Sequence, residues 1–278
     1  MQIVVDAMGS DNHPAPDVAG AVQAARDWGI AIILVGDQAQ IEAELAKQET
    51  ADLAITVRHA PEAIGMEDKP SDIIKNKPNS SMHVGMALVK SGEADAFVTM
   101  GNTGAALGVA MLRKVGLGRI KGVKRPALGV VFPTDGFPIL VDGGANADCR
   151  PDYLLQFALM GSVYMKKVQG HKNPTVALVS NGEEEGKGTT LIREAMPLIA
   201  NSGLNYVGFI EPNEFVAGAV NVAVTDGFTG NIIMKTSEAI ASSVSAYLRE
   251  EIRSSFLTTL GGLLARPAFG RVRSRMQP

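Results

Sequence analysis

Five glycine-rich turns hold most of the residues of this sequence that could do chemistry. They span residues 6–11, 101–105, 142–146, 180–188 and 226–231, and each follows a short apolar run. One such turn alone is often purely structural, because glycine adopts positive φ and Thr or Asn caps helices without any ligand. Five turns of one design, at strand ends where helix N-termini offer free N–H groups, indicate a pocket for a phosphate-type anion. The chemistry they favour is group transfer.

Three amide side chains are candidates for contact with a reacting group. Asn102, Asn146 and Asn231 each stand in or beside a glycine turn, and an amide can donate to an oxyanion while it stays neutral. Thr103 and Thr229 occupy the same turns, where we expect them to be helix N-caps with or without a ligand. The amides are therefore the more informative residues.

The turn at residues 180–188 resembles a phosphate loop but departs from it. Only three residues separate Gly182 from Gly186, and all three are glutamates that would repel a nucleotide phosphate. We expect these glutamates to form a solvated first helical turn, stabilised by the helix dipole. Lys187, the only cation of the turn, is the better anion ligand.

Other familiar signatures are absent from the sequence. Residues 116–118 read Gly-Leu-Gly but follow a helical run, with no third glycine at dinucleotide-binding spacing. The sequence has no Gly-x-Ser-x-Gly elbow and no zinc-type histidine pair, so we expect neither a metal site nor a cofactor. The four scattered histidines are His13, His59, His83 and His171.

Two further side chains have both a chemical and a structural interpretation. Cys149, the only cysteine, follows the 142–146 turn and could form a covalent thioester, although a small buried apolar residue is the favoured interpretation. His83 could act as a general acid or base, but a packed or surface histidine is the commoner case. With one cysteine, no intramolecular disulfide can form, which fits the cytoplasm.

Short β-branched runs, each closed by Gly, Asp or Asn, predict the strands that must position these turns. Because the runs are continuously apolar, we expect strands buried on both faces of a mainly parallel sheet, with helices between them. Residues 128–132 and 139–142 flank Thr134-Asp135-Gly136, which predicts a β-hairpin and makes the sheet mixed. The fold class is α/β. The other predicted strands are residues 3–6, 30–36, 55–59, 97–101, 176–181, 207–210 and 222–226.

Composition restricts the class of protein. With 278 residues, 46% of them hydrophobic and 20% charged, the chain can bury a sizeable core, and we expect one domain over residues 1–278. A net charge of −3 argues against binding nucleic acid through bulk electrostatics. The N-terminus does not resemble a secretion signal, and no apolar run is long enough to span a membrane. These features predict a cytoplasmic protein.

Read together, the turns resemble the bacterial phosphate acyltransferase family, the acyl-ACP:phosphate transacylases called PlsX. The resemblance covers almost the whole chain, and the order and spacing of its motifs are highly specific. One departure is Ser10, where the family usually has a second glycine after Asp-Ala-Met. The stretches that carry the resemblance are residues 5–9, 100–105, 141–146, 182–188 and 224–231.

The resemblance implies a fold like that of isocitrate dehydrogenase and phosphotransacetylase. It implies transfer of a long-chain fatty acyl group from acyl carrier protein to inorganic phosphate, which gives acyl phosphate for phospholipid synthesis. Phosphate supplies its own nucleophilic oxygen, so the protein need only orient it against the thioester carbonyl and stabilise the oxyanion. We therefore expect direct attack without a catalytic Ser or Cys.

The expected catalytic set is Lys187, Asn231, Asn102 and Asn146. Lys187 and Asn231 bind phosphate with Lys235 and loop N–H groups, whereas Asn102 and Asn146 support the carbonyl oxygen. Further residues expected to bind phosphate or the acyl group are Asp6, Gly9, Gly101, Thr103, Gly104, Gly143, Gly144, Gly186, Gly188, Asp226, Thr229 and Gly230.

The segment at about residues 230–275 predicts contacts with a partner. A long helix from Gly230 carries an apolar face that could serve a homodimer. Beyond it, Gly261-Gly262 and Pro267 should break a continuous helix, which favours an exposed apolar and basic tip over core packing. Such a tip suits peripheral binding to an anionic membrane or to acidic acyl carrier protein. The expected contact residues are Leu260, Leu263, Leu264, Arg266, Arg271 and Arg273.

Alternative functions remain at this stage. A short-chain phosphotransacetylase would differ only in its acyl donor, and a metal-dependent decarboxylating dehydrogenase would need an aspartate cluster and a nicotinamide site, neither of which is evident. A non-catalytic scaffold recruited to membranes is the alternative from another class. Family members usually continue past the position of Pro278 through a strand and a helix, which we expect to be absent here.

Overall fold

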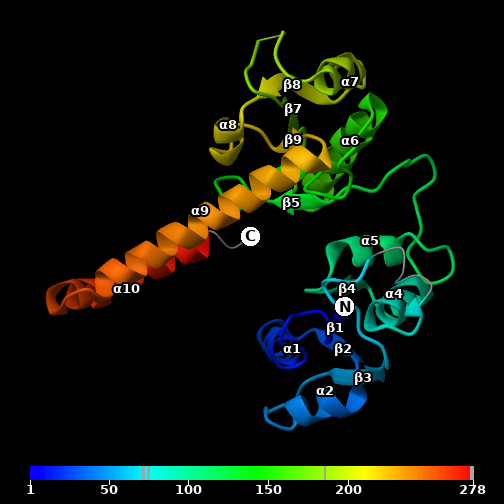
Figure 1. Cartoon of the computed structure of the whole chain (residues 1–278), viewed down its shortest axis with the longest axis vertical. Coiled ribbons are helices and arrows are strands. Elements are labelled where there is room, and N and C mark those ends of the chain that lie inside the picture. The colour runs from blue at the N-terminus through cyan, green and yellow to red at the C-terminus, as the bar shows by residue number, and fades with distance from the viewer. Residues whose placement is uncertain (70–72, 74–75, 185, 276–278) are drawn as a thin grey trace. The chain divides into compact units, whose positions relative to one another are not determined.

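The computed structural model describes residues 1–69, 73, 76–184 and 186–275. The chain, for which the sequence predicts one domain over residues 1–278, forms two compact units, Met1–Lys121 and Gly122–Pro278. Its strands lie in two sheets rather than one, because each unit closes its own hydrophobic core around its own strands. Figure 1 shows the elements of both units.

The first unit is a parallel α/β sandwich of helix, sheet and helix. Its four strands lie in the order β3-β2-β1-β4, and every pair is parallel. On β1, Val5 packs toward α1 while its neighbour Val4 packs toward α4, so successive side chains enter different cores. This explains the continuous apolar runs. The elements are β1 (Gln2–Asp6), α1 (Ala15–Trp28), β2 (Ala31–Gly36), α2 (Gln38–Leu45), β3 (Ile55–His59), α4 (Ser81–Ser91), β4 (Ala96–Val98) and α5 (Thr103–Ala110).

The second unit is built on a mixed five-stranded sheet in the order β5-β6-β9-β7-β8. The expected hairpin is confirmed: β5 and β6 are antiparallel, and the turn between them places Gly136 at φ +82°. All other strand pairs are parallel. The elements are β5 (Gly129–Val131), β6 (Ile139–Val141), α6 (Pro151–Lys167), β7 (Thr175–Val179), α7 (Thr190–Ala200), β8 (Asn205–Ile210), α8 (Pro212–Val216), β9 (Val222–Val224), α9 (Gly227–Arg253) and α10 (Phe256–Arg275).

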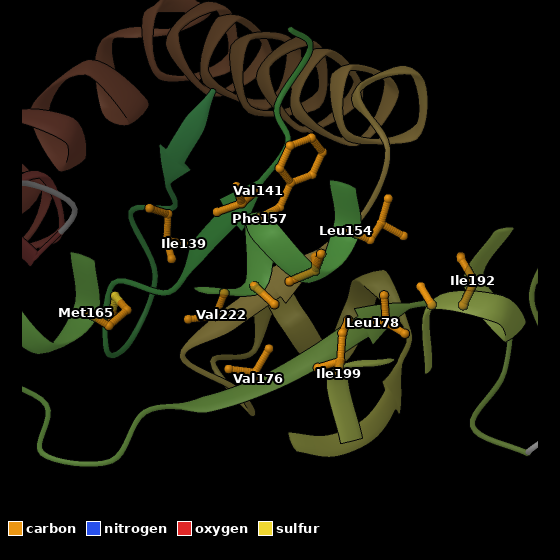
Figure 2. Packing of buried hydrophobic residues seen from close by; sticks show 13 residues of the cluster. Ile139, Val141, Leu154, Phe157, Met165, Val176, Leu178, Ile192, Ile199 and Val222 are labelled. Atoms are coloured by element: carbon orange, nitrogen blue, oxygen red, sulfur yellow. The ribbon is translucent and has the colours of Figure 1, made fainter. Parts of the chain in front are cut away.

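The core of the second unit holds the ends of its strands in place. Leu154 and Phe157 of α6 pack against Val141 and Val222 on one face of the sheet (Figure 2). On the other face, the Phe132 and Phe215 rings meet edge-on with centroids 4.7 Å apart. With both faces buried, the turns at the carboxyl ends of β6, β7 and β9 start from a rigid base.

The last two helices form a helical hairpin in which α10 contacts α9 (Figure 1). The expected break at Gly261-Gly262 and Pro267 is wrong, because α10 runs through all three residues. A Cβ at Gly262 would lie 2.4 Å from Ile252 Cγ2, so glycine here permits close packing on α9. Pro267 is exposed and removes only one backbone donor from a 20-residue helix. Within the described residues, no helix is both long and apolar enough to cross a bilayer.

Candidate active site

Asp142, at the carboxyl end of β6, organises the central turn of the second unit. Its fully buried carboxylate accepts hydrogen bonds from the backbone N–H groups of Leu128 (2.9 Å), Gly144 (3.2 Å), Ala145 (2.9 Å) and Asn146 (2.7 Å). The Asn146 amide also donates to it at 2.8 Å. Hydrogen bonds to the ionised form offset the cost of burying this charge. The sequence marks the turn as functional, but this role of the aspartate was not predicted.

The start of α9 packs directly on that turn. Gly227 N–H donates to the carbonyl oxygen of Asn146 at 2.8 Å. A Cβ at Gly230 would lie only 1.9 Å from the Asp142 carbonyl oxygen, so no other residue fits there without movement. Gly144 has φ +141°, and a Cβ at this position would approach the Asn231 side-chain oxygen to 3.5 Å. The turn at residues 142–146 and the turn at residues 226–231 therefore pack against each other and form one structural unit.

Helix α9 is capped by an aspartate. Asp226 accepts hydrogen bonds from the Thr229 N–H at 2.9 Å and the Thr229 hydroxyl at 3.0 Å. In the first unit, Asn102 caps α5 by accepting from Ala105 N–H at 3.0 Å. The prediction of Thr103 and Thr229 as N-caps is wrong, because both lie inside their helices and the side chains of Asn102 and Asp226 accept the capping hydrogen bonds instead.

A cavity of about 520 Å³ opens beside these turns in the second unit. It lies where the turn after β7 meets the first residues of α7 and α9, so the positive dipole ends of two helices border it. None of the described residues that line it has a charged side chain. The lining residues are Val179, Ser180, Asn181, Gly188, Thr189, Ile192, Pro212, Thr229, Ile232 and Ile233.

Gly188 closes the β7 turn over this cavity. Its φ of +83° favours glycine, its N–H donates to the Asn181 side-chain oxygen at 2.9 Å, and its carbonyl accepts from the Arg193 guanidinium at 2.6 Å. Neither Arg193 nor Asn181 is among the predicted site residues, although Asn181 lies in a predicted turn. Arg193 lies outside the turn motif, so only its position one helical turn into α7 could have drawn attention to it.

The acidic part of the same turn faces other carboxylates. Glu183 and Glu184 are exposed in a bend rather than in a helix, since α7 begins only at Thr190, so the expected first helical turn is wrong; Glu185 lies outside the described residues. A hydrogen bond with Glu214 and the negative charge of Glu214 raise the pKa of Glu183. Gly186 is exposed at the edge of the turn.

The predicted cations of the site lie at the surface. Lys187 is exposed, and its stem packs near Gly182, where a Cβ would lie 3.0 Å from Lys187 Cγ. Lys235, on the third turn of α9, forms a 2.9 Å ion pair with Glu238, and both side chains are largely exposed. Such surface pairs contribute little and can exchange for another anion.

The three predicted amide side chains differ in whether their N–H groups already donate hydrogen bonds within the protein. The Asn146 amide is used by Asp142 and by the Pro126 carbonyl oxygen at 2.8 Å. The Asn102 amide donates to the carbonyl oxygens of Met66 (3.0 Å) and Asp68 (3.1 Å). Asn231 is exposed, and its side chain has no hydrogen-bond partner within the described part of the chain.

The first unit has its own glycine-lined edge. Asp6, nearly fully buried, accepts from Met8 N–H at 3.0 Å and from the Thr99 hydroxyl at 2.7 Å. A Cβ at Gly9 would lie 2.9 Å from Gly101 N, so the turns after β1 and β4 touch. Thr103 and Gly104 are exposed in the first turn of α5. Asp6 therefore holds its turn much as Asp142 does.

Comparison with known proteins identifies the family to which this chain belongs. The family model described as fatty acid synthesis protein matches residues 1–278. The phosphate acyltransferase of Geotalea daltonii is 47% identical over 270 residues, which are 97% of this chain and 77% of that protein. The phosphate acyltransferase of Geobacter sulfurreducens is 46% identical over 277 residues, 99% of this chain and 79% of its own. The chain belongs to the phosphate acyltransferase family.

Solved structures agree with this family fold. A phosphotransacetylase from Streptococcus pyogenes aligns with a TM-score of 0.61 at 20% identity, over 87% of this chain and 82% of that chain. The EutD phosphotransacetylase from Staphylococcus aureus gives the same TM-score, identity and coverage. At this identity the likeness shows the fold alone, and it confirms the predicted α/β class.

Cys149 is a packing residue of the second unit. It is half-buried against the core of the second unit, and its thiol donates to the Asn146 carbonyl oxygen at 3.3 Å. Burial raises the pKa of the Cys149 thiol to about 11. At neutral pH the nucleophilic thiolate is therefore a very small fraction of the population.

We expect Cys149→Ser to keep most of the activity and wild-type Cys149 to react slowly with iodoacetamide at pH 7. Mass spectrometry of the alkylated protein and a turnover assay check both. Trapping of an acyl group on Cys149 during turnover would contradict direct attack by phosphate.

His83 is the packed histidine that the sequence favoured. It is buried in α4, its Nδ1 lies 2.8 Å from the Ser80 hydroxyl, and burial lowers the pKa of the imidazole. A neutral buried ring at pH 7 fits a structural role in the first unit.

Proposed function

We propose that this chain transfers a long-chain fatty acyl group from acyl carrier protein to inorganic phosphate, forming acyl phosphate for phospholipid synthesis. The observation that carries the proposal is the cavity at the N-terminal ends of α7 and α9, whose described lining residues offer hydroxyls and one amide but no charged side chain. Helix N-termini favour anions, and an uncharged lining does not repel phosphate. Relatives named phosphate acyltransferase support the same reaction class.

Phosphate binding is assigned to Lys187, Asn231 and Lys235 together with N–H groups of the turns. Asn231 is next to Gly144 and has donors to offer, and the two exposed lysines can reach an anion by rotation of their side chains. The amides of Asn102 and Asn146 are already bonded, so we assign them to holding their turns rather than to the oxyanion. Correct positioning of phosphate against the thioester would supply much of the rate.

The test is a phosphate-dependent loss of acyl donor by the purified protein. Long-chain acyl-[acyl carrier protein] and acetyl-CoA are compared at equal concentration, with and without inorganic phosphate. We expect acyl phosphate only with phosphate present, and faster turnover of the long-chain donor. Preference for acetyl-CoA would favour a short-chain phosphotransacetylase, and absence of turnover with every donor would favour a non-catalytic scaffold.

The tip of the α9–α10 hairpin is proposed to bind anionic membrane. Phe256, Leu257 and Leu264 are at least three-quarters exposed, and Leu260 and Leu263 lie on the same helix. α10 contains no acidic residue. Arg266 and Arg271 are exposed, whereas the side chain of Arg273 lies outside the described residues. Apolar side chains beside arginines suit the interface of an anionic bilayer, where each basic residue contributes about 1 kcal/mol.

We expect the protein to sediment with vesicles containing phosphatidylglycerol at low salt and to be released as salt is raised. Leu263→Glu should reduce the bound fraction several-fold without lowering the melting temperature, because the side chain is 62% exposed. Ala39→Glu, exposed on α2 of the first unit, controls for added charge. A wild-type protein that stays in the supernatant, or unfolding of Leu263→Glu, would contradict the proposal. The alternative partner of the same arginines is acyl carrier protein. Because the vesicle assay contains no acyl carrier protein, binding in it reports membrane contact alone.

The exposed stripe on α9 is proposed as a homodimer interface. From Ala241 to Glu250 every residue of α9 is exposed. Ile240, Val244, Tyr247 and Leu248 recur at helical spacing and are each at least half exposed. A monomer seldom leaves so long an apolar stripe in water.

A further inference from the structure

The hydroxyl of Ser180 is buried without a partner at the edge of the cavity. Ser180 is 7% exposed and follows β7 directly, and its backbone N–H is bonded to the Ile210 carbonyl oxygen at 2.9 Å. Its side-chain oxygen has no hydrogen-bond partner within the described residues. A buried hydroxyl without a partner is unfavourable, so its presence in a cavity lining suggests a group that arrives with the substrate.

The surroundings of Ser180 suit an anion. Among the described residues that line the cavity there is no carboxylate or ammonium, and the N-terminal ends of an 11-residue and a 27-residue helix meet there. Asn181 is oriented by its bond to Gly188 N–H through its oxygen, which leaves its amide N–H groups to donate. Asp226, which caps α9, has both carboxylate oxygens engaged by Thr229.

The turn packs its glycine directly against the Ser180 hydroxyl. A Cβ at Gly188 would lie 3.2 Å from Ser180 Oγ, so any larger residue would crowd the hydroxyl. The Arg193 guanidinium and the Asn181 side chain both bond Gly188 and hold it in place. These contacts account for a glycine at this position beyond its positive φ.

We propose that Ser180 is a substrate-binding residue whose hydroxyl donates a hydrogen bond to the phosphate group, beside the amide of Asn181. The inference rests on the proposed function and adds a ligand to its phosphate site. Hydrogen bonds from neutral donors orient the phosphate without transferring a proton to it, so one of its oxygens stays available to attack the thioester carbonyl.

The test is Ser180→Ala, measured by steady-state kinetics with phosphate varied and by the shift in melting temperature on adding inorganic phosphate. We expect the KM for phosphate to rise about 10- to 100-fold, as for loss of a hydrogen bond to a charged group. The KM for the acyl donor should stay within about twofold. The melting temperature without phosphate should stay equal or rise, since an unpaired buried hydroxyl is removed.

Ser81→Ala is the matched control, because Ser81 is also buried with an unpaired hydroxyl but lies on α4 of the first unit. It should leave the KM for phosphate unchanged. If wild type turns over and Ser180→Ala keeps its phosphate KM within twofold, the inference is wrong while the proposed function stands. If wild type shows neither turnover nor stabilisation by phosphate, both are wrong.

Discussion

Asp142→Ala should lower the melting temperature by roughly 6–20 °C and abolish turnover. The substitution removes the acceptor of four backbone N–H groups and one amide that are held in and around the 142–146 turn. Leaving several buried donors unpaired costs about 3–5 kcal/mol in total, and each kcal/mol shifts the melting temperature by roughly 2–4 °C at this domain size. Calorimetry and the acyl transfer assay measure the two effects.

The matched control is Asp148→Ala, in the same stretch of chain. Asp148 is exposed, so its removal should change the melting temperature by about 1–2 °C at most. Asp142→Asn should lie between the two, because one oxygen remains to accept while the new amide opposes the donors of Asn146. Equal melting temperatures for Asp142→Ala and Asp148→Ala would show that the turn does not depend on the carboxylate.

Gly230→Ala should destabilise the second unit by about 3 kcal/mol or more, although alanine is the better helix former by about 1 kcal/mol. The new Cβ would overlap the Asp142 carbonyl oxygen at 1.9 Å, and backbone atoms on both sides leave no side chain to move away. The start of α9 must therefore shift away from the turn, and the positions of Thr229 and Asn231 shift with it. Denaturant unfolding and the apparent phosphate constant measure the result.

Gly261→Ala provides the comparison, since a Cβ there meets no atom within 4 Å. It should leave stability unchanged or raise it by up to about 1 kcal/mol. If Gly230→Ala behaved like Gly261→Ala, the close packing of α9 on the 142–146 turn would be incorrect.

The strands and the hairpin could be read from local sequence because their signals are local. Continuous apolar runs such as residues 139–142 and 222–226 correspond to β6 and β9, and Thr134-Asp135-Gly136 forms the turn of the hairpin. Burial on both faces follows from the same runs. The division of the strands between two sheets depends on pairings between distant segments, which no local pattern specifies.

Helix ends and the continuity of α10 were harder to predict. Thr103 and Thr229 have the chemistry of caps, but the residue that takes the extended conformation is decided by how the preceding turn packs. Gly262 looked like a helix breaker, whereas its contact with Ile252 makes it a site of close helix packing. Propensity is a weak prior that tertiary contacts override.

Residue types and spacing determined the α/β class and the turns in which the site residues lie, and the resemblance of those turns to known proteins indicated the family. Only the tertiary structure decided which polar groups in those turns are already bonded. Asn146 donates to Pro126, whereas Asn231 and Ser180 keep their polar atoms unpaired within the described residues. The physical reason is that a side chain's type sets the hydrogen bonds it can make, whereas its neighbours in space, often distant in the chain, determine which of them are made.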